Sequence, residues 1–219
     1  MLSHKKDTDY LALSAWTRAK ENELLTRERL DRMIEAKDLG EAVKVLTQCG
    51  YSEPESLTQA GLEAMLAQER QRTFQELGGS VPDPRVVQLF QLKYDYHNAK
   101  TLIKGRAMGE DADRLLMAGG RYDPGQLAEK FARPARGEPA AACAAAVLQA
   151  KQLLADTGDP QLCDLALDRA CYAELAQLAQ ETESQFLIGY VALMTDVANL
   201  RAAVRIARMG RENDFLAQA

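Results

Sequence analysis

The chain has 219 residues, of which 47% are hydrophobic and 27% charged, an ordinary composition for a globular protein with one large or two smaller domains. A net charge of −5 argues against general nucleic-acid binding, which requires a basic surface. No window approaches the roughly 18 to 20 uninterrupted apolar residues of a membrane span, and the start lacks the apolar core of a secretory signal, so we expect a cytoplasmic protein.

Helical spacing of apolar residues dominates the first half of the chain. Four helices are expected there, over residues 7–37 (one long helix or two abutting ones), 39–46, 57–77 and 84–108. The segment GGSVPDP at residues 78–84 is expected to break the third helix. Asp83 and Pro84 are a typical helix start, because Asp is a good cap and Pro suits the first helical position.

The second half continues in the same way after a turn-rich junction at residues 119–126 and a loop at residues 131–139. Three more helices are expected, over residues 139–155, 163–180 and 184–209. No alternating pattern of useful length indicates a strand. The predicted fold class is therefore all-α.

The ends of the two halves resemble each other. One constant offset aligns residues 92–109, LKYDYHNAKTLIKGRAMG, with residues 193–210, LMTDVANLRAAVRIARMG. The aligned pairs include Leu92 with Leu193, Asp95 with Asp196, Asn98 with Asn199, Lys100 with Arg201, Lys104 with Arg205 and Gly109 with Gly210. Both segments carry the spacing of three and four that buries one helix face. We therefore predict two similar helical domains, residues 1–113 and 114–219.

Two polar pairs recur in this alignment, Asp95 with Asn98 and Asp196 with Asn199. Residues three apart lie on one side of a helix, so each pair could form a binding site or bond neighbouring backbone. Recurrence in both halves favours the structural role.

Four basic residues also recur at helical spacing, Lys100 with Lys104 and Arg201 with Arg205. A solvated helix face is the simplest interpretation. The alternative is a ridge that contacts acidic partners.

The sequence carries no motif for catalysis, cofactor binding or metal binding. Neither G-x-x-x-x-G-K-[ST] nor G-x-G-x-x-G occurs, and the two histidines, His4 and His97, belong to no ligand pattern. The four cysteines are scattered without a C-x-x-C pair and are expected to be buried, reduced thiols. We therefore assign no catalytic, cofactor or metal residue.

Several segments resemble one known family: DTDYLALSAWTRAKENELL at residues 7–25, LKYDYHNAKTLIKG at 92–105, LALDRACYAEL at 165–175 and the D-x-x-N-x-R helix at 196–201. Over essentially its whole length the chain resembles the C (d-type) subunit of V/A-type rotary ATPases and ATP synthases. This resemblance implies three similar helical domains arranged like a funnel, of which the sequence shows two and the first residues of a third. The expectation is a chain cut short at its C-terminal end, as a truncated form or a short variant.

The resemblance also implies a function. Such a subunit is non-catalytic, binds no cofactor, and couples the central-stalk axle to the membrane proteolipid ring during proton or sodium transport or ATP synthesis. It would be cytoplasmic and peripheral to the membrane through the ring, and would not bind nucleic acid. The alternatives are an unrelated helical adaptor or scaffold and an enzyme with an unrecognised polar pocket.

Overall fold

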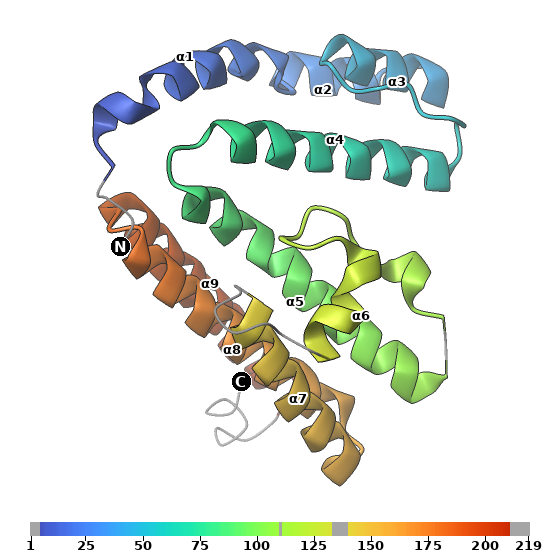
Figure 1. Cartoon of the computed structure of the whole chain (residues 1–219). Coiled ribbons are helices and arrows are strands. Elements are labelled where there is room, and N and C mark those ends of the chain that lie inside the picture. The colour runs from blue at the N-terminus through green and yellow to red at the C-terminus, as the bar shows by residue number, and fades with distance from the viewer. Residues whose placement is uncertain (1–4, 110, 133–139, 211–219) are drawn as a thin grey trace. The chain divides into compact units, whose positions relative to one another are not determined.

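The computed structural model describes residues 5–109, 111–132 and 140–210, and every regular element in these ranges is a helix (Figure 1). The all-α prediction is therefore confirmed. The chain divides into two compact units, Met1–Pro84 and Arg85–Ala219. This division does not follow the repeat-based boundary between residues 113 and 114, and the two similar domains stay a prediction.

The first unit contains four helices and two 3-10 turns among its described residues. They are η1 (Asp7–Tyr10), α1 (Leu11–Lys20), η2 (Glu21–Glu23), α2 (Arg27–Ile34), α3 (Leu39–Gln48) and α4 (Gln59–Ser80). Within this unit, α4 runs back alongside the α1–α2 segment (Figure 1). The Thr26 hydroxyl accepts a hydrogen bond from the Arg29 N–H at 3.3 Å and caps α2. The first predicted helix is thus broken into separate pieces.

The end of α4 differs from the sequence prediction. Gly78 and Gly79 are helical, so the helix does not end at residue 77. A glycine in a helix costs only about 1 kcal/mol relative to alanine, and the neighbouring turns of the helix can offset this loss. The helix ends when Val81 becomes extended, because the following Pro82 disfavours helical backbone before it.

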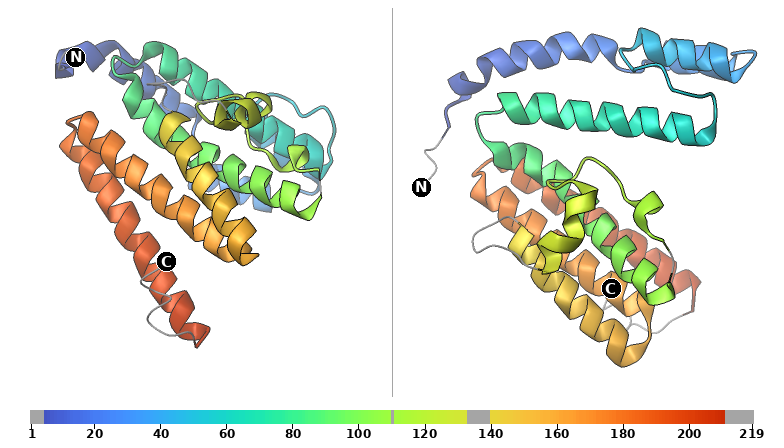
Figure 2. Two further views of the ribbon diagram at one scale, coloured as in Figure 1. Left: turned by 60° about the horizontal axis from the view of Figure 1, so that its bottom comes forward. Right: turned by 45° about the vertical axis from the view of Figure 1, so that its right-hand side comes forward.

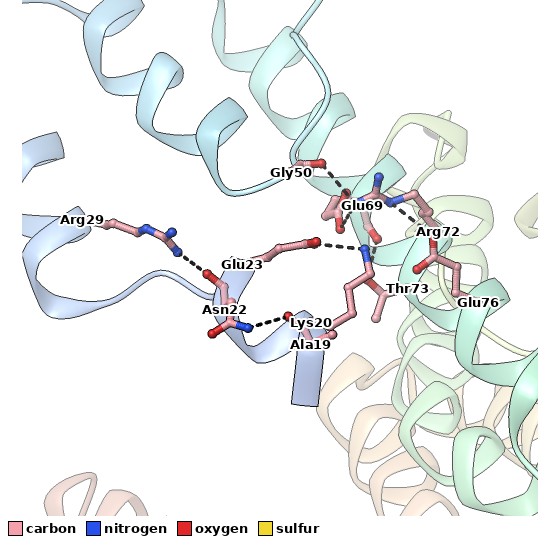
Figure 3. A network of polar contacts seen from close by, with 10 residues as sticks. All are labelled: Ala19, Lys20, Asn22, Glu23, Arg29, Gly50, Glu69, Arg72, Thr73 and Glu76. Atoms are coloured by element: carbon pink, nitrogen blue, oxygen red, sulfur yellow. Dashed lines mark hydrogen bonds and ion pairs between the residues drawn. The ribbon is translucent and has the colours of Figure 1, made fainter. Parts of the chain in front are cut away.

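Arg72 joins α4 to the end of α3 in the first unit (Figure 3). Its Nη2 donates to the Gly50 carbonyl at 3.1 Å and to Glu69 Oε1 at 2.8 Å. Gly50 has φ +88°, which favours glycine, and a Cβ there would lie 3.1 Å from Glu23 Oε2. The buried apolar residues of this unit are Val43, Val45, Leu46, Cys49 and Met65. Polar contacts therefore supplement a small core.

The regular elements described in the second unit are also helices. They are α5 (Pro84–Met108, starting at the last residue of the first unit), η3 (Asp113–Leu115), α6 (Pro124–Ala132), α7 (Ala140–Thr157), α8 (Pro160–Glu181) and α9 (Gln185–Arg208). Short connections join α7, α8 and α9, which pack as antiparallel neighbours (Figure 2). The sequence prediction missed α6, which begins at Pro124 and buries Leu127 and Phe131. Residues 133–139 of the predicted loop lie outside the described ranges.

The core of the second unit lies where α5, α6, α7, α8 and the first turns of α9 meet. Small residues on α7 allow close helix packing, and Cys143, Ala144 and Ala150 are fully buried. The α5 residues of this core are Leu89, Leu92, Tyr96, Ala99 and Ile103. All four cysteines of the chain are free and buried, as predicted.

The offset found in the sequence also relates the helix boundaries. It pairs the starts of α4 and α8 at Gln59 and Pro160, their ends at Ser80 and Glu181, and the starts of α5 and α9 at Pro84 and Gln185. Helix boundaries depend on local capping and breaking residues, which the two halves do not share in detail. The agreement supports the proposed duplication.

Among the described helices, α9 alone is long and apolar enough to cross a membrane by length and composition, with a mean hydropathy of 1.3. The sequence predicted this helix but did not mark it as a candidate membrane span. One such helix is weak evidence for a membrane span.

Candidate functional site

The most buried polar cluster of the second unit centres on Arg121. Its backbone N–H donates to Asp95 Oδ1 at 3.0 Å, and its Nε donates to Asp95 Oδ2 at 2.6 Å. Its Nη1 donates to Glu174 Oε1 at 2.7 Å. The Asp95 and Arg121 side chains are only 1% and 5% exposed. Arg121 therefore links α5 to α8 inside the unit.

The approach of the Arg121 segment to α5 requires glycine. Gly119 has φ +104°, a left-handed conformation that glycine adopts without strain. A Cβ on Gly120 would lie 2.3 Å from Asp95 Oδ1, which is inside van der Waals contact. The Gly120 carbonyl also accepts a hydrogen bond from Gln91 Nε2 at 3.1 Å. Gly119 and Gly120 of the predicted junction thus allow the segment to pack closely on α5 as well as to turn.

Asn98 holds the same segment one helical turn further along α5. Its Nδ2 donates to the Met117 carbonyl at 2.9 Å, and its Oδ1 accepts from the Met117 N–H at 2.8 Å. Asn98 and Asp95 are both fully buried. Together they clamp residues 117–121 onto α5, which is the kind of backbone bonding expected of a structural pair.

The electrostatics of the cluster reflect two carboxylates that share one guanidinium. Burial raises the pKa of Asp95, and the attraction of Arg121 offsets this only in part. Tyr96 donates its hydroxyl to Glu174 Oε2 at 2.8 Å, and burial together with the Glu174 charge raises the pKa of Tyr96. The hydroxyl therefore acts as a donor that satisfies Glu174.

Lys100 and Lys104 contact α8 rather than forming a free ridge. Lys100 Nζ lies 2.5 Å from Asp168 Oδ1, and Lys104 Nζ lies 2.6 Å from Asp164 Oδ2. Residues four apart on α5 thereby meet residues four apart on α8. These aspartates were not singled out from the sequence, although their spacing matches that of the lysines.

The second set of repeated residues has a different environment. Asp196 and Asn199 are exposed, and neither side chain makes a hydrogen bond or ion pair with another described residue. The offset that relates the repeats carries Met117, a partner of the first pair, to position 218, which lies outside the described ranges, and carries Arg121 past the last residue of the sequence. Among the described residues, only the first of the two pairs is buried and bonded to a neighbouring segment.

A groove of about 550 Å³ lies between α8 and α9. Its polar lining includes Asp168, Arg169 and Tyr172 from α8 and Asn199, Arg201 and Arg205 from α9. Two of the four predicted basic residues, Arg201 and Arg205, thus border an open groove. The groove therefore combines arginine side chains with one carboxylate, that of Asp168, and with apolar walls.

The described part of the chain offers little for catalysis. It contains no group of three or more His, Cys, Asp or Glu residues arranged to hold a metal. His97 Nε2 lies 3.4 Å from the Leu115 carbonyl, and His4 lies outside the described ranges. Burial raises the pKa of Cys171 to about 12, which keeps this thiol protonated and weakly nucleophilic.

The chain matches the model of the family described as ATP synthase (C/AC39) subunit over residues 13–219. It is 23% identical over 210 residues to the C subunit of the V-type sodium ATPase of Enterococcus hirae, a match that covers 95% of this chain and 64% of that protein. It is 28% identical over 140 residues to the C subunit of the V-type ATP synthase of Thermus thermophilus, covering 58% of this chain and 41% of that protein. The chain thus spans less than two thirds of the relatives' length. No solved structure gives a significant match.

Proposed function

Because the chain belongs to the ATP synthase (C/AC39) subunit family, we propose that it serves as a non-catalytic subunit of a V-type rotary ATPase. The observation that carries this proposal is the family match, which extends from residue 13 to residue 219. Relatives from two bacteria are named as the C subunit of a V-type ATPase or ATP synthase. The protein would act in ion pumping or in ATP synthesis, with protons or sodium.

Its role in the complex is to couple the central-stalk axle to the membrane proteolipid ring. A coupling subunit must transmit torque without deforming, so its helices must be tied to one another. The buried Asp95–Arg121–Glu174 network and the two Lys–Asp pairs tie α5 to α8 at several points. These ties support a mechanical role. The protein would be cytoplasmic and attached to the membrane through the ring.

Contact with acidic partners is proposed for Arg201 and Arg205, which border the α8–α9 groove. Lys100 and Lys104 have carboxylate partners on α8 already. Their role is therefore assigned to internal support.

Co-purification tests this function. A tagged chain, expressed in its source cells, is isolated from mild-detergent extracts of membranes, and its companions are identified by mass spectrometry. We expect axle and proteolipid-ring subunits at near-stoichiometric amounts. Recovery of the folded chain without any rotary ATPase subunit would contradict the proposal.

A second measurement addresses the non-catalytic role. Calorimetry with Mg²⁺ and ATP is expected to show no binding, because no phosphate-binding loop occurs in the sequence. Micromolar binding, or ATP hydrolysis by the isolated chain, would argue for an enzyme instead.

A further inference from the structure

The last turn of α4 has little besides its own backbone to hold it in place. Gly78, Gly79 and Ser80 are helical but exposed. A Cβ on either glycine would meet no atom within 4 Å apart from its chain neighbours and the nearby helix backbone. The Val81 N–H closes the turn by donating to the Leu77 carbonyl at 2.8 Å. Because glycine loses more conformational freedom in a helix than any other residue, this turn unwinds easily.

The residues that follow this turn are stiff by comparison. The rings of Pro82 and Pro84 fix their φ angles, and a residue that precedes a proline is held near the extended conformation. This restriction applies to Val81, at φ −74° and ψ 130°, and to Asp83. Asp83 is only 5% exposed and directly precedes the first residue of α5. Residues 81–84 therefore form a stiff extension of α5.

The equivalent turn at the end of α8 is built differently. The offset of the repeat carries Gly78 to Ala179 and Gly79 to Gln180. Ala179 is 1% exposed and belongs to the core of the second unit, so the α8 turn is packed in place. Helices α8 and α9 lie in one unit, whereas α4 and α5 lie in different units apart from Pro84. Of the two equivalent helix connections, the one between the units thus has the exposed glycine turn.

We propose that the last turn of α4, residues 78–80, is a hinge between the two compact units. Unwinding of this turn changes the direction of the chain between α4 and residues 81–84, which move together with α5. Each unit keeps its own contacts, since Arg72 ties α4 to the end of α3 (Figure 3) and Arg121 ties α5 to α8. The inference does not depend on the proposed rotary ATPase function, whose supporting ties lie within the second unit.

Hydrogen exchange of the full chain tests the local part of the inference. The amides of residues 78–81 should have lower protection factors than those in the middle of α4, because the hinge turn opens without the rest of the helix. Gly78→Ala/Gly79→Ala should raise these protection factors at least about tenfold, since each alanine favours the helix over the unwound chain by a factor of about four. Gly189→Ala is the matched control and should leave them unchanged. Gly189 is also an exposed helical glycine, and a Cβ there meets no such atom either.

Distances between spin labels test the motion itself. The labels are attached through p-acetylphenylalanine, which leaves the four buried cysteines unchanged. One pair of exposed sites, Lys44 in α3 and Ala145 in α7, places a label in each unit. A second pair, Lys93 in α5 and Ala145, lies within the second unit. By double electron–electron resonance, we expect a broad distance distribution for the first pair and a narrow one for the second.

The same variants assign the breadth to the hinge. Gly78→Ala/Gly79→Ala should narrow the distribution of the first pair, because the turn remains helical for more of the time. Gly189→Ala should leave both distributions unchanged. A first distribution as narrow as the second in the natural chain would overturn the inference, as would protection factors at residues 78–81 that the double variant does not raise. Breadth that persists in the double variant would also overturn it and would place the motion in residues 81–84.

Discussion

Asp95 illustrates how one buried side chain depends on features far along the chain. Its carboxylate receives two hydrogen bonds from Arg121 and has the backbone of Gly120 against it. A buried charge is tolerated only when it is paired and hydrogen-bonded, so each of these neighbours contributes to stability. Substitutions at the two neighbours test the arrangement separately.

Gly120→Ala should destabilise the protein by about 1–3 kcal/mol, because the added methyl group would displace the Asp95 carboxylate. The measurement is urea unfolding monitored by circular dichroism. Gly79→Ala is the matched control, because the site is helical and no atom other than those of its chain neighbours and of the nearby helix backbone lies within 4 Å of a Cβ there. It should be neutral or stabilising by about 0.5–1 kcal/mol. Equal effects at the two glycines would contradict the proposed close approach.

Arg121→Met should destabilise the protein by about 3–5 kcal/mol, because it leaves two buried carboxylates, Asp95 and Glu174, without their shared cation. Arg121→Lys should recover only part of this loss, since a lysine cannot bind both carboxylates through a fixed planar fork. Full stability of the methionine variant would show that the network contributes nothing to the fold.

The destabilisation caused by Arg121→Met should also depend on pH. Burial raises the pKa of Asp95 in the folded protein, and removal of Arg121 eliminates the attraction that opposes this shift. A carboxyl group with a raised folded pKa adds stability that is lost as pH rises through that pKa. The difference in the free energy of unfolding between the natural protein and the variant should therefore shrink as the pH is lowered from 7 to 5. Unfolding titrations at both values measure it, and a constant deficit would contradict the assignment.

At the scale of elements, α5 and α8 are joined by a row of polar contacts beside an apolar core. Lys100–Asp168 and Lys104–Asp164 lie at the edge, with side chains 22–49% exposed, whereas Tyr96 and Glu174 lie further in. Partly exposed ion pairs contribute little energy because water screens them. Their main effect is to fix which residues of the two helices face each other.

A charge swap tests this registration. Lys104→Asp and Asp164→Lys should each cost about 0.2–1 kcal/mol, and the double variant should recover most of the loss because the pair is restored in reverse. Urea unfolding of the four proteins provides the double-mutant cycle. Strictly additive losses would mean that the two side chains do not interact in solution.

At the scale of the whole molecule, the apolar core of the second unit is drawn from residues 89–191, all within Arg85–Ala219. The predicted domain boundary at residue 113 would cut α5 away from this core. A domain can fold alone when it contains its own core.

We therefore expect a fragment of residues 85–219 to be helical and to melt cooperatively. A fragment of residues 114–219 should lose this cooperativity, because it lacks the α5 residues Leu92, Tyr96 and Ile103. Thermal melts followed by circular dichroism compare the two. Equally cooperative melting of both fragments would favour the boundary predicted from the repeat.

The sequence by itself determined the all-α class, most helix positions and the family. These properties follow from local patterns: apolar spacing of three and four, capping residues, and motifs such as YDYHN. It also singled out Asp95 and Asn98 through their repetition. Helix α6 was missed because its short apolar pattern lies among turn residues, where local signals conflict.

Only the tertiary structure decided which partners these residues have. Arg121 and Glu174 are separated from Asp95 by 26 and 79 positions in the numbering, so no local pattern connects them to it. The difference between α5 and α9 was also invisible in the sequence, since both helices carry the same pattern. Exposure depends on what packs against a helix, and α8 covers the first of the two faces while leaving Leu193 and Leu200 of the second exposed.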